Sequence, residues 1–237
     1  MTELLYLTNA YLYEFDARVV DVSNDGHVML DCTCFYPSGG GQPCDIGTLN
    51  FENTQCNVLK VVKEGNQIWH VIDEEYCPNI GQSVKGLIDW DLRYNLMRTH
   101  TAMHILCGVI WRDYGASVTG GNMTPLRGRM DFEFANMTID LVKDIESSIN
   151  VEINKARDVK VNVMPRDEAF QIPDLIRTKI NLLPKGITEV RTVEIVGLDL
   201  QADGGTHVSN TQEVGQMHIV DYKSKGRINK RLVIEIS

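Results

Sequence analysis

Hydrophobic and polar residues alternate in short runs through the first third of the chain, a pattern that predicts β-strands. Examples are Arg18–Val22, His27–Cys32 and Ile68–Ile72, and Asn24-Asp25-Gly26 between the first two is a typical hairpin turn. No helical periodicity precedes residue 89. We therefore expect residues 1–88 to form a small β-barrel.

A helical period begins after Asp89, which can cap a helix that continues to Trp111. Thr138 opens a second long helix, and strands on both sides of the helices predict an antiparallel sheet beneath them. We therefore predict an α+β fold whose second domain covers residues 89–237. The other expected elements are strands at 117–119 and 129–134 joined by a Gly120-Gly121 turn, strands at 159–164, 190–195, 216–222 and 231–236, a short helix at 166–172 and a loop at 198–208.

Composition narrows the class of protein. The 237 residues are 43% hydrophobic and 23% charged, which is typical of a globular chain, and no apolar run is long enough for a membrane span. Six cysteines without a CxxC pair, and a first segment without a basic leader, favour reduced thiols in a cytoplasmic protein. The net charge of −9 argues against a general DNA or RNA binder and leaves room for a local basic patch.

The strongest chemical motif is the pair His100 and His104, four residues apart on the predicted helix. This spacing puts both imidazoles on one helical face, where they can bind one metal ion. Thr101 stands where a metalloprotease of the HExxH type would have its glutamate, so the helix offers no protease base. Two histidines that are merely surface or core residues are the alternative.

A second motif places Asp203 and His207 on either side of Gly204-Gly205-Thr206. Glycines allow a sharp turn and close approach to a ligand, so these two side chains could complete a four-ligand zinc site with His100 and His104. A tight Asp-Gly-Gly turn with a solvated histidine explains the motif about equally well.

Two further segments are candidates for binding. The run Ser38-Gly39-Gly40-Gly41-Gln42 can present backbone N–H groups to a polar ligand, although a purely structural loop is the commoner explanation. A cluster of positive charges near the end of the chain can contact a phosphate backbone, or it can simply be a solvated turn. This cluster consists of Lys223, Lys225, Arg227, Lys230 and Arg231.

Taken together, RTHTAMH at 98–104, DGGTHVSNTQEVG at 203–215 and FYPSGGGQP at 35–43 resemble the AlaX family of freestanding alanyl-tRNA editing proteins. These proteins are related to the editing domain of alanyl-tRNA synthetase. The resemblance covers nearly the whole chain and is greatest to the medium-length members, which carry an N-terminal β-barrel. It implies that residues 89–237 form the editing domain.

The resemblance also implies an activity: hydrolysis of seryl-tRNA(Ala), and in some members glycyl-tRNA(Ala), with one Zn²⁺ per chain. The implied zinc ligands are His100, His104, Asp203 and His207, and Asp203 replaces the cysteine of better-known members. From the residues, we expect the amides of Gly204 and Gly205 to stabilise the oxyanion and a threonine to recognise the serine hydroxyl. The candidate threonines are Thr101, Thr119 and Thr206.

Two other functions stay open at this point. One is a metal-dependent hydrolase of a small ester or amide that does not use RNA, which the acidic net charge favours slightly. The other is a tRNA-binding module without catalytic activity. The sequence does not determine the oligomeric state, or whether the enzyme prefers serine or glycine.

Overall fold

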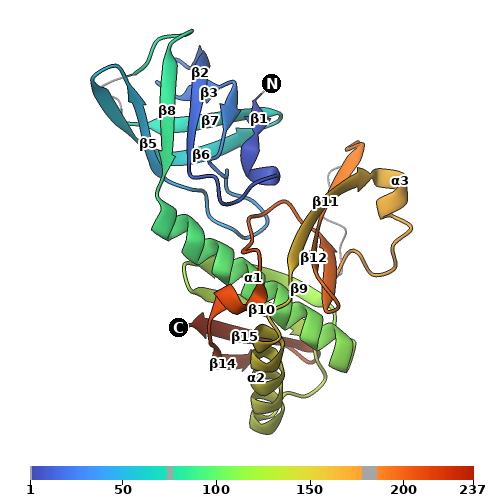
Figure 1. Ribbon diagram of the computed structural model, residues 1–237. Coiled ribbons are helices and arrows are strands. Elements are labelled where there is room, and N and C mark those ends of the chain that lie inside the picture. Colours follow the sequence, from blue (N-terminus) through green and yellow to red (C-terminus); the bar gives the residue numbers. More distant parts are fainter. Residues whose placement is uncertain (1, 74–76, 178–185) are drawn as a thin grey trace. The chain divides into compact units, whose positions relative to one another are not determined.

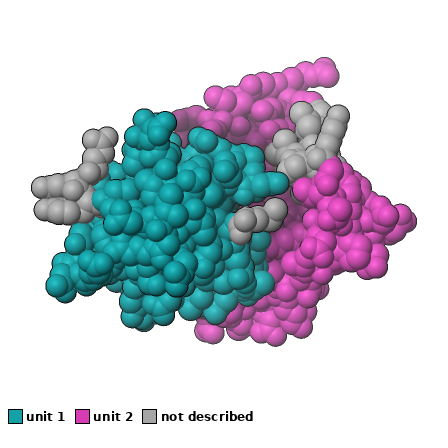
Figure 2. All heavy atoms as spheres, turned by 90° about the horizontal axis from the view of Figure 1, so that it is seen from above, with its two compact units in different colours: residues 1–95 teal, residues 96–237 magenta. Residues whose placement is uncertain are grey.

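The computed structural model describes residues 2–73, 77–177 and 186–237. The chain divides into two compact units, residues 1–95 and 96–237, which are coloured separately in Figure 2. The division falls within the first long helix, α1 (Trp90–Tyr114). Within the described residues, none of the helices combines the length and hydropathy needed to cross a bilayer.

The first unit contains a closed β-barrel, as the alternating pattern predicts (Figure 1). A separate sheet of two short parallel strands is formed by β1 (Glu3–Leu4) and β4 (Cys32–Thr33), and a 3-10 turn covers Leu5–Leu7. The strands follow one another around the barrel in the order β2 (Glu14–Val22), β3 (Val28–Leu30), β7 (Gln67–Ile72), β6 (Thr54–Glu64), β5 (Gly47–Phe51) and β8 (Ser83–Ile88).

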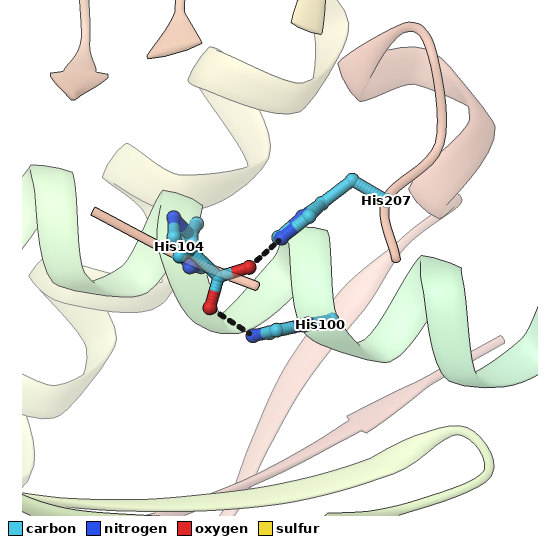
Figure 3. A group of neighbouring side chains, drawn as sticks. His100, His104 and His207 are labelled. Atoms are coloured by element: carbon cyan, nitrogen blue, oxygen red, sulfur yellow. Dashed lines mark hydrogen bonds and ion pairs between the residues drawn. The ribbon is translucent and has the colours of Figure 1, made fainter. Parts of the chain in front are cut away.

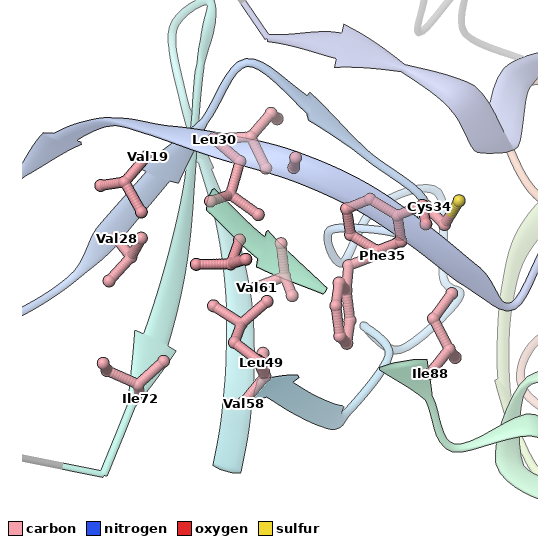
Figure 4. Packing of buried hydrophobic residues seen from close by; sticks show 14 of the residues in the cluster. Val19, Val28, Leu30, Cys34, Phe35, Leu49, Val58, Val61, Ile72 and Ile88 are labelled. Atoms are coloured by element: carbon pink, nitrogen blue, oxygen red, sulfur yellow. The ribbon is translucent and has the colours of Figure 1, made fainter. Parts of the chain in front are cut away.

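Alternate residues of these strands fill the barrel interior. Val19, Leu30, Leu49 and Val61 of these strands are almost completely buried, and Phe35 from the segment after β4 packs with them, as Figure 4 shows. Burial of one large aliphatic or aromatic side chain contributes about 1.5–3 kcal/mol to the folding free energy. Burial of this cluster therefore stabilises the closed barrel.

One histidine lies inside this apolar barrel. The ring of His70 donates from Nδ1 to the carbonyl of Val28 at 3.0 Å, and Nε2 lies 2.9 Å from Oγ1 of Thr33. Since a carbonyl can only accept, Nδ1 carries the proton and Nε2 accepts from the threonine hydroxyl. Burial lowers the pKa of His70 to about 4, so the ring is neutral at physiological pH.

Helix α1 begins where the sequence predicts. The carboxylate of Asp89 accepts a hydrogen bond from the amide of Leu92 at 3.0 Å, and Gly115, with a φ of +63°, follows the last helical residue. The second long helix, α2 (Ile139–Asn154), is capped by Thr138, whose hydroxyl accepts from the amide of Leu141. Both predicted helices are confirmed.

In the described part of the second unit, the strands form two antiparallel sheets (Figure 1). Helix α2 packs on the first of them through Asn150, whose amide exchanges two hydrogen bonds with the backbone of Met217. The first sheet has the order β14 (Met217–Ser224), β15 (Asn229–Ile236), β10 (Arg127–Glu133), β9 (Val118–Thr124). The second has the order β11 (Val159–Pro165), β12 (Glu189–Ile195), β13 (Asp199–Ala202), with the short helices α3 (Arg166–Ala169) and η2 (Thr211–Val214) nearby in the chain.

The Gly120-Gly121 turn predicted from the sequence is wrong, because both glycines lie inside β9 and pair with β10. The turn comes later, at Leu126, whose φ is +59°. A β-carbon at Gly121 would lie 3.2 Å from the side chain of Met103, and one at Gly128 would lie 3.0 Å from it. These glycines therefore let the sheet approach α1 closely instead of turning the chain.

Two smaller expectations also fail. The helix predicted over 166–172 is only four residues long, Arg166–Ala169. The loop predicted over 198–208 contains strand β13, which pairs with β12. The polar residues of β13 hide its alternation in the sequence.

Candidate metal centre

Helix α1 carries His100 and His104 on one face, one turn apart. Their ring centroids are 5.1 Å from each other, and the two residues are only 6% and 7% exposed. The i, i+4 spacing therefore puts both imidazoles on one face of the helix, as predicted, and this face is nearly buried.

A loop after β13 brings His207 to this pair. The loop is anchored at Asp203, whose backbone exchanges hydrogen bonds with Arg191, and at Val208, whose amide donates to Oγ1 of Thr101 on α1. The ring centroid of His207 lies 4.2 Å from that of His100 and 4.7 Å from that of His104, so three imidazoles surround one point (Figure 3).

The carboxylate of Asp203 lies among these rings. Its Oδ2 is 3.0 Å from Nε2 of His207, and its Oδ1 is 3.6 Å from Nε2 of His100, as the dashed lines in Figure 3 mark. The amide of Gly205 also donates to Oδ2, at 2.7 Å. One atom from each of the four predicted ligands lies within 4.8 Å of the others.

Burial and charge set the protonation states of this cluster. Burial lowers the pKa of His100 to about 4, and burial together with nearby His100 holds the pKa of His207 well below its usual value. Burial opposes the charge of Asp203, but the neighbouring imidazoles outweigh it and keep the pKa of this carboxyl well below its usual range. At neutral pH, Asp203 is therefore ionised and the imidazoles of His100 and His207 have lone pairs to offer.

These residues fit a zinc ion. In a tetrahedral site with bonds of about 2.0–2.2 Å, ligand atoms lie roughly 3.3–3.6 Å apart, close to the Asp203–imidazole distances here. Three imidazoles and one carboxylate are also a donor set that zinc accepts. The Nε2 atoms of His100 and His207 both face the carboxylate of Asp203. In the metal-bound protein, these two nitrogens would face the ion instead.

Each imidazole also has a partner on its outer side. The Nδ1 atom of His207 is 3.1 Å from Oγ1 of Thr101, and a hydrogen bond to the backbone of Thr206 acts on the His100 ring. The Nδ1 atom of His104 lies 3.3 Å from Oδ2 of Asp199. Such outer partners fix the orientation of metal-binding imidazoles, and they are expected at a metal centre.

The residues predicted to act in catalysis or in serine recognition differ in exposure and in hydrogen-bond partners. Thr101 and Thr206 are fully buried, and the hydroxyl of Thr101 contacts His207 and Val208. The amide hydrogen of Gly205 is taken by Asp203, so it does not face outward as an oxyanion donor would. Gly204 is exposed. Thr119, the third threonine considered, is exposed and donates to Oδ1 of Asn229.

The glycine-rich loop Ser38–Gln42 belongs to the first unit. The backbones of Gly39 and Gln42 exchange two hydrogen bonds, and Gly40 and Gly41 have φ values of +57° and +90°, which favour glycine. The loop is thus a tight backbone turn, as its composition predicts. Its role in substrate binding stays a prediction.

A buried ion pair holds this loop in place. Asp45 accepts a hydrogen bond from the amide of Tyr36 and forms an ion pair with Arg93, and both charged side chains are fully buried. The guanidinium of Arg93 also donates to the carbonyls of Ala10 and Cys34. The loop is therefore anchored at both of its ends by one charged pair.

Several charges of the predicted RNA-binding cluster have partners within the protein. The ammonium of Lys230 donates to the carbonyls of Gly226 and Arg227, so it holds the β14–β15 hairpin together. Arg231 forms two hydrogen bonds of 2.7 Å with Asp131, and Lys223 is paired with Asp221. Lys225 and Arg227 are exposed, and among the described residues neither has an ion pair.

Sequence reasoning missed three residues behind the centre. Asp199 and Gln201 lie on β13, and Arg177 precedes β12 in the chain. The alternation of Asp199, Gln201 and Asp203 is the sequence signal for the two residues of β13, and the strand had to be recognised before this signal could be interpreted.

Comparison with known proteins shows the family to which this chain belongs. The model of the second additional domain of threonyl and alanyl tRNA synthetases matches residues 190–233, which include Asp203 and His207, and a class II tRNA synthetase (A) model matches residues 8–92. The alanyl-tRNA editing protein AlaX-M of Saccharolobus solfataricus is 40% identical over 234 residues, 98% of each chain. The chain belongs to the AlaX-M family of alanyl-tRNA editing proteins.

Other AlaX-M and synthetase sequences agree with this assignment. The AlaX-M protein of Methanosarcina barkeri is 40% identical over 98% of both chains. The alanine–tRNA ligase of Ignicoccus hospitalis is 38% identical over 92% of this chain, which corresponds to 24% of the ligase. The chain is therefore an enzyme, an aminoacyl-tRNA deacylase like the other AlaX-M proteins, and the predicted family is confirmed.

Proposed function

We propose that this chain hydrolyses the ester that joins serine to tRNA(Ala), using one zinc ion bound by His100, His104, His207 and Asp203. The observation that carries the proposal is the meeting of four ligand atoms within 4.8 Å in a chain of the AlaX-M family. The names of the relatives support alanyl-tRNA as the object of editing. Serine as the amino acid is our own proposal, with glycine as a second candidate.

The proposed reaction is attack of water on an ester carbonyl, with the 3′-terminal hydroxyl of the tRNA as leaving group. When bound, zinc supplies a Lewis acid that polarises the ester or lowers the pKa of water. The chain's own residues hold the centre in shape. Asp203 would supply the carboxylate ligand beside His100 and His207, and Thr101 orients His207 through Nδ1.

The developing negative charge needs hydrogen-bond donors close to the reacting carbon. Of the two glycine amides predicted for this task, we retain Gly204, because it is exposed next to the centre in the sequence and Gly205 donates to Asp203. The amide of Gly205 then serves to hold the carboxylate in place.

Selectivity for serine over alanine requires a partner for one hydroxyl group. A site that binds a substrate hydroxyl rejects the analogue without it, because its own polar atoms would be left unpaired. Thr101 and Thr206 are fully buried and Thr119 is exposed, and all three stay candidates for this contact. We also propose that the loop Ser38–Gln42 binds substrate, so replacing Gly39–Gly41 with alanines should relax selectivity before hydrolysis is lost.

Binding of tRNA is proposed at the β14–β15 hairpin. Lys225 and Arg227 are the candidates for phosphate contacts, with Lys223 as a weaker one because Asp221 pairs with it. Lys230 and Arg231 act indirectly in this proposal, since their charges hold the hairpin and its neighbouring strand.

The test is deacylation of seryl-, glycyl- and alanyl-tRNA(Ala) by one preparation of the enzyme. We expect fast release of serine, slower release of glycine and protection of alanine. Equal rates on all three would contradict the proposed selectivity. Hydrolysis of small seryl esters at the same rate as seryl-tRNA would favour the alternative of a hydrolase that does not use RNA. A cytoplasmic location, which translation would require, stays a prediction.

A further inference from the structure

We infer that Asp199 is a positioning residue for the metal centre: its carboxylate holds the ring of His104 so that Nε2 faces the ion. This inference rests on the proposed metal site and concerns a residue outside the ligand set. Asp199 begins strand β13, four residues before Asp203.

The carboxylate faces one particular nitrogen of the imidazole. Oδ2 of Asp199 lies 3.3 Å from Nδ1 of His104, and the Asp199 side chain is completely buried. The Nδ1 atom is buried as well. Because Nδ1 is turned toward Asp199, Nε2 is the nitrogen of His104 left for the metal.

The carboxylate is itself held in place by neighbours. The amide of Gln201 donates to Oδ2 at 2.6 Å, and Nε of Arg177 lies 3.5 Å from Oδ1. The guanidinium of Arg177 packs over the ring of Trp111, 4.7 Å from its centroid. A β-carbon at Gly108 would lie 3.0 Å from that of Asp199, so this glycine is what lets β13 approach α1 closely.

Unsatisfied polar atoms also gather at this place. Within the described residues, the buried side-chain nitrogen and oxygen atoms without a hydrogen bond are Nδ1 of His104, Oδ1 of Asp199, and Nε and Nη1 of Arg177. The contacts of 3.3 Å and 3.5 Å between them are therefore ion-pair distances without the alignment of a hydrogen bond. Leaving such atoms unpaired in a core costs stability, so their concentration behind one ligand calls for a function. Metal binding at Nε2 makes the Nδ1 proton more acidic and strengthens its bond to a carboxylate.

The outer partner of His104 differs in kind from those of the other two imidazoles. The partner of His207 is the hydroxyl of Thr101, and a backbone group of Thr206 acts on His100. A carboxylate makes its imidazole a stronger metal donor than a neutral partner does. We therefore expect Asp199 to contribute to metal affinity as well as to geometry.

The experiment measures zinc affinity of the full chain by competition with a chromophoric chelator, together with thermal unfolding of the zinc-free protein. Asp199→Asn should weaken zinc binding by about 10- to 100-fold, as loss of an outer-shell partner does elsewhere. The matched control is Glu152→Gln, another buried carboxylate of the same unit, which is bound by Arg112, Lys155 and Arg157. It should lower the melting temperature and leave zinc affinity unchanged.

A zinc affinity of Asp199→Asn equal to that of wild type would overturn the inference and leave the proposed metal site intact. Failure of the wild-type chain to bind zinc would overturn the metal site itself. Should Asp199→Asn fail to fold, Gln201→Leu replaces it, because this change removes the donor that holds Oδ2 and keeps the Asp199 carboxylate. It should weaken zinc binding by roughly threefold, on the scale of one neutral hydrogen bond, and an unchanged affinity would again overturn the inference.

Discussion

The two units of the chain each bury histidine, but they use it differently. In the barrel, both nitrogens of His70 have a partner, the carbonyl of Val28 and the hydroxyl of Thr33, and the ring offers nothing more. In the second unit, His207 has an outer partner at Nδ1 and turns Nε2 toward a shared carboxylate, and His100 likewise presents Nε2 to it. Burial alone therefore does not identify a site. A metal site is identified by ring nitrogens that face one point while the opposite nitrogen of the ring contacts another protein group.

Buried carboxylates show the same contrast. Asp45 in the barrel is enclosed by an arginine and a backbone amide, so its charge is used for structure. Asp203 is partly exposed among three imidazoles, where a cation can reach it. The comparison predicts that substitutions of His70 and Asp45 act on stability, and that substitutions of His100, His104, Asp203 and His207 act on metal binding and catalysis.

The largest expected effect is a difference in activity between variants of a metal-centre histidine, His104, and of the barrel histidine, His70. His104→Ala should abolish tight zinc binding and reduce seryl-tRNA hydrolysis by about 1000-fold or more, since Lewis-acid assistance contributes several kcal/mol and each 1.36 kcal/mol is tenfold in rate. His70→Gln should leave kcat of the folded enzyme within about twofold of wild type. Zinc titration and single-turnover deacylation of both variants measure this, and equal losses in the two would remove the distinction.

The second prediction concerns the barrel carboxylate. Asp45→Ala leaves the guanidinium of Arg93 buried without its partner, which should cost about 3–5 kcal/mol of unfolding free energy. The control, Glu14→Ala, breaks an exposed pair with Lys85 and should cost less than about 1 kcal/mol. Denaturant unfolding supplies the measurement. A small loss in Asp45→Ala would mean that the pair does not anchor the barrel.

The third prediction is a pH dependence. The pKa of His70 is lowered to about 4 by burial, so on acidification the unfolded chain takes up the proton first. Stability of the barrel should therefore be fully retained above about pH 6.5 and fall by roughly 3 kcal/mol toward pH 4. His70→Gln should flatten this part of the curve. Unfolding titrations at several pH values test it, and an unchanged slope in the variant would assign the effect to other groups.

The smallest expected effect concerns the basic hairpin. The double variant Lys225→Gln/Arg227→Gln should bind tRNA about tenfold more weakly and show a shallower salt dependence, by roughly one unit of slope for each lost phosphate contact. Lys143→Gln/Lys160→Gln removes the same charge from exposed positions elsewhere in the second unit. Similar binding curves for both double variants would point to the overall charge rather than to the hairpin.

The sequence was sufficient for the parts of this account that depend on local pattern. Alternation predicted the barrel strands, Asp89 predicted the start of α1, and the spacing of His100 and His104 predicted a shared face. The link to His207 came from the order of three motifs, because a contact across 106 residues of chain, such as that of Thr101 with His207, has no local signature.

The wrong sequence-based predictions have one physical origin. In each case tertiary packing, and not the local sequence, determines the secondary structure of the residue. Gly120 and Gly121 suggest a turn, yet both lie inside β9, where Gly121 leaves room for Met103 of α1. Asp199 and Gln201 suggest a loop, yet they form a strand whose polar side chains meet His104 and each other. The pair Asp45–Arg93, 48 residues apart, was invisible for the same reason.

The central claim is that the four residues His100, His104, Asp203 and His207 form a metal centre required for editing. The most direct measurement is seryl-tRNA(Ala) hydrolysis by the chain as purified, after removal of metal by a chelator, and after addition of one equivalent of zinc. We expect activity to disappear with the metal and to return with the zinc. Full activity in a preparation that metal analysis shows to be free of zinc and other transition metals would contradict the claim.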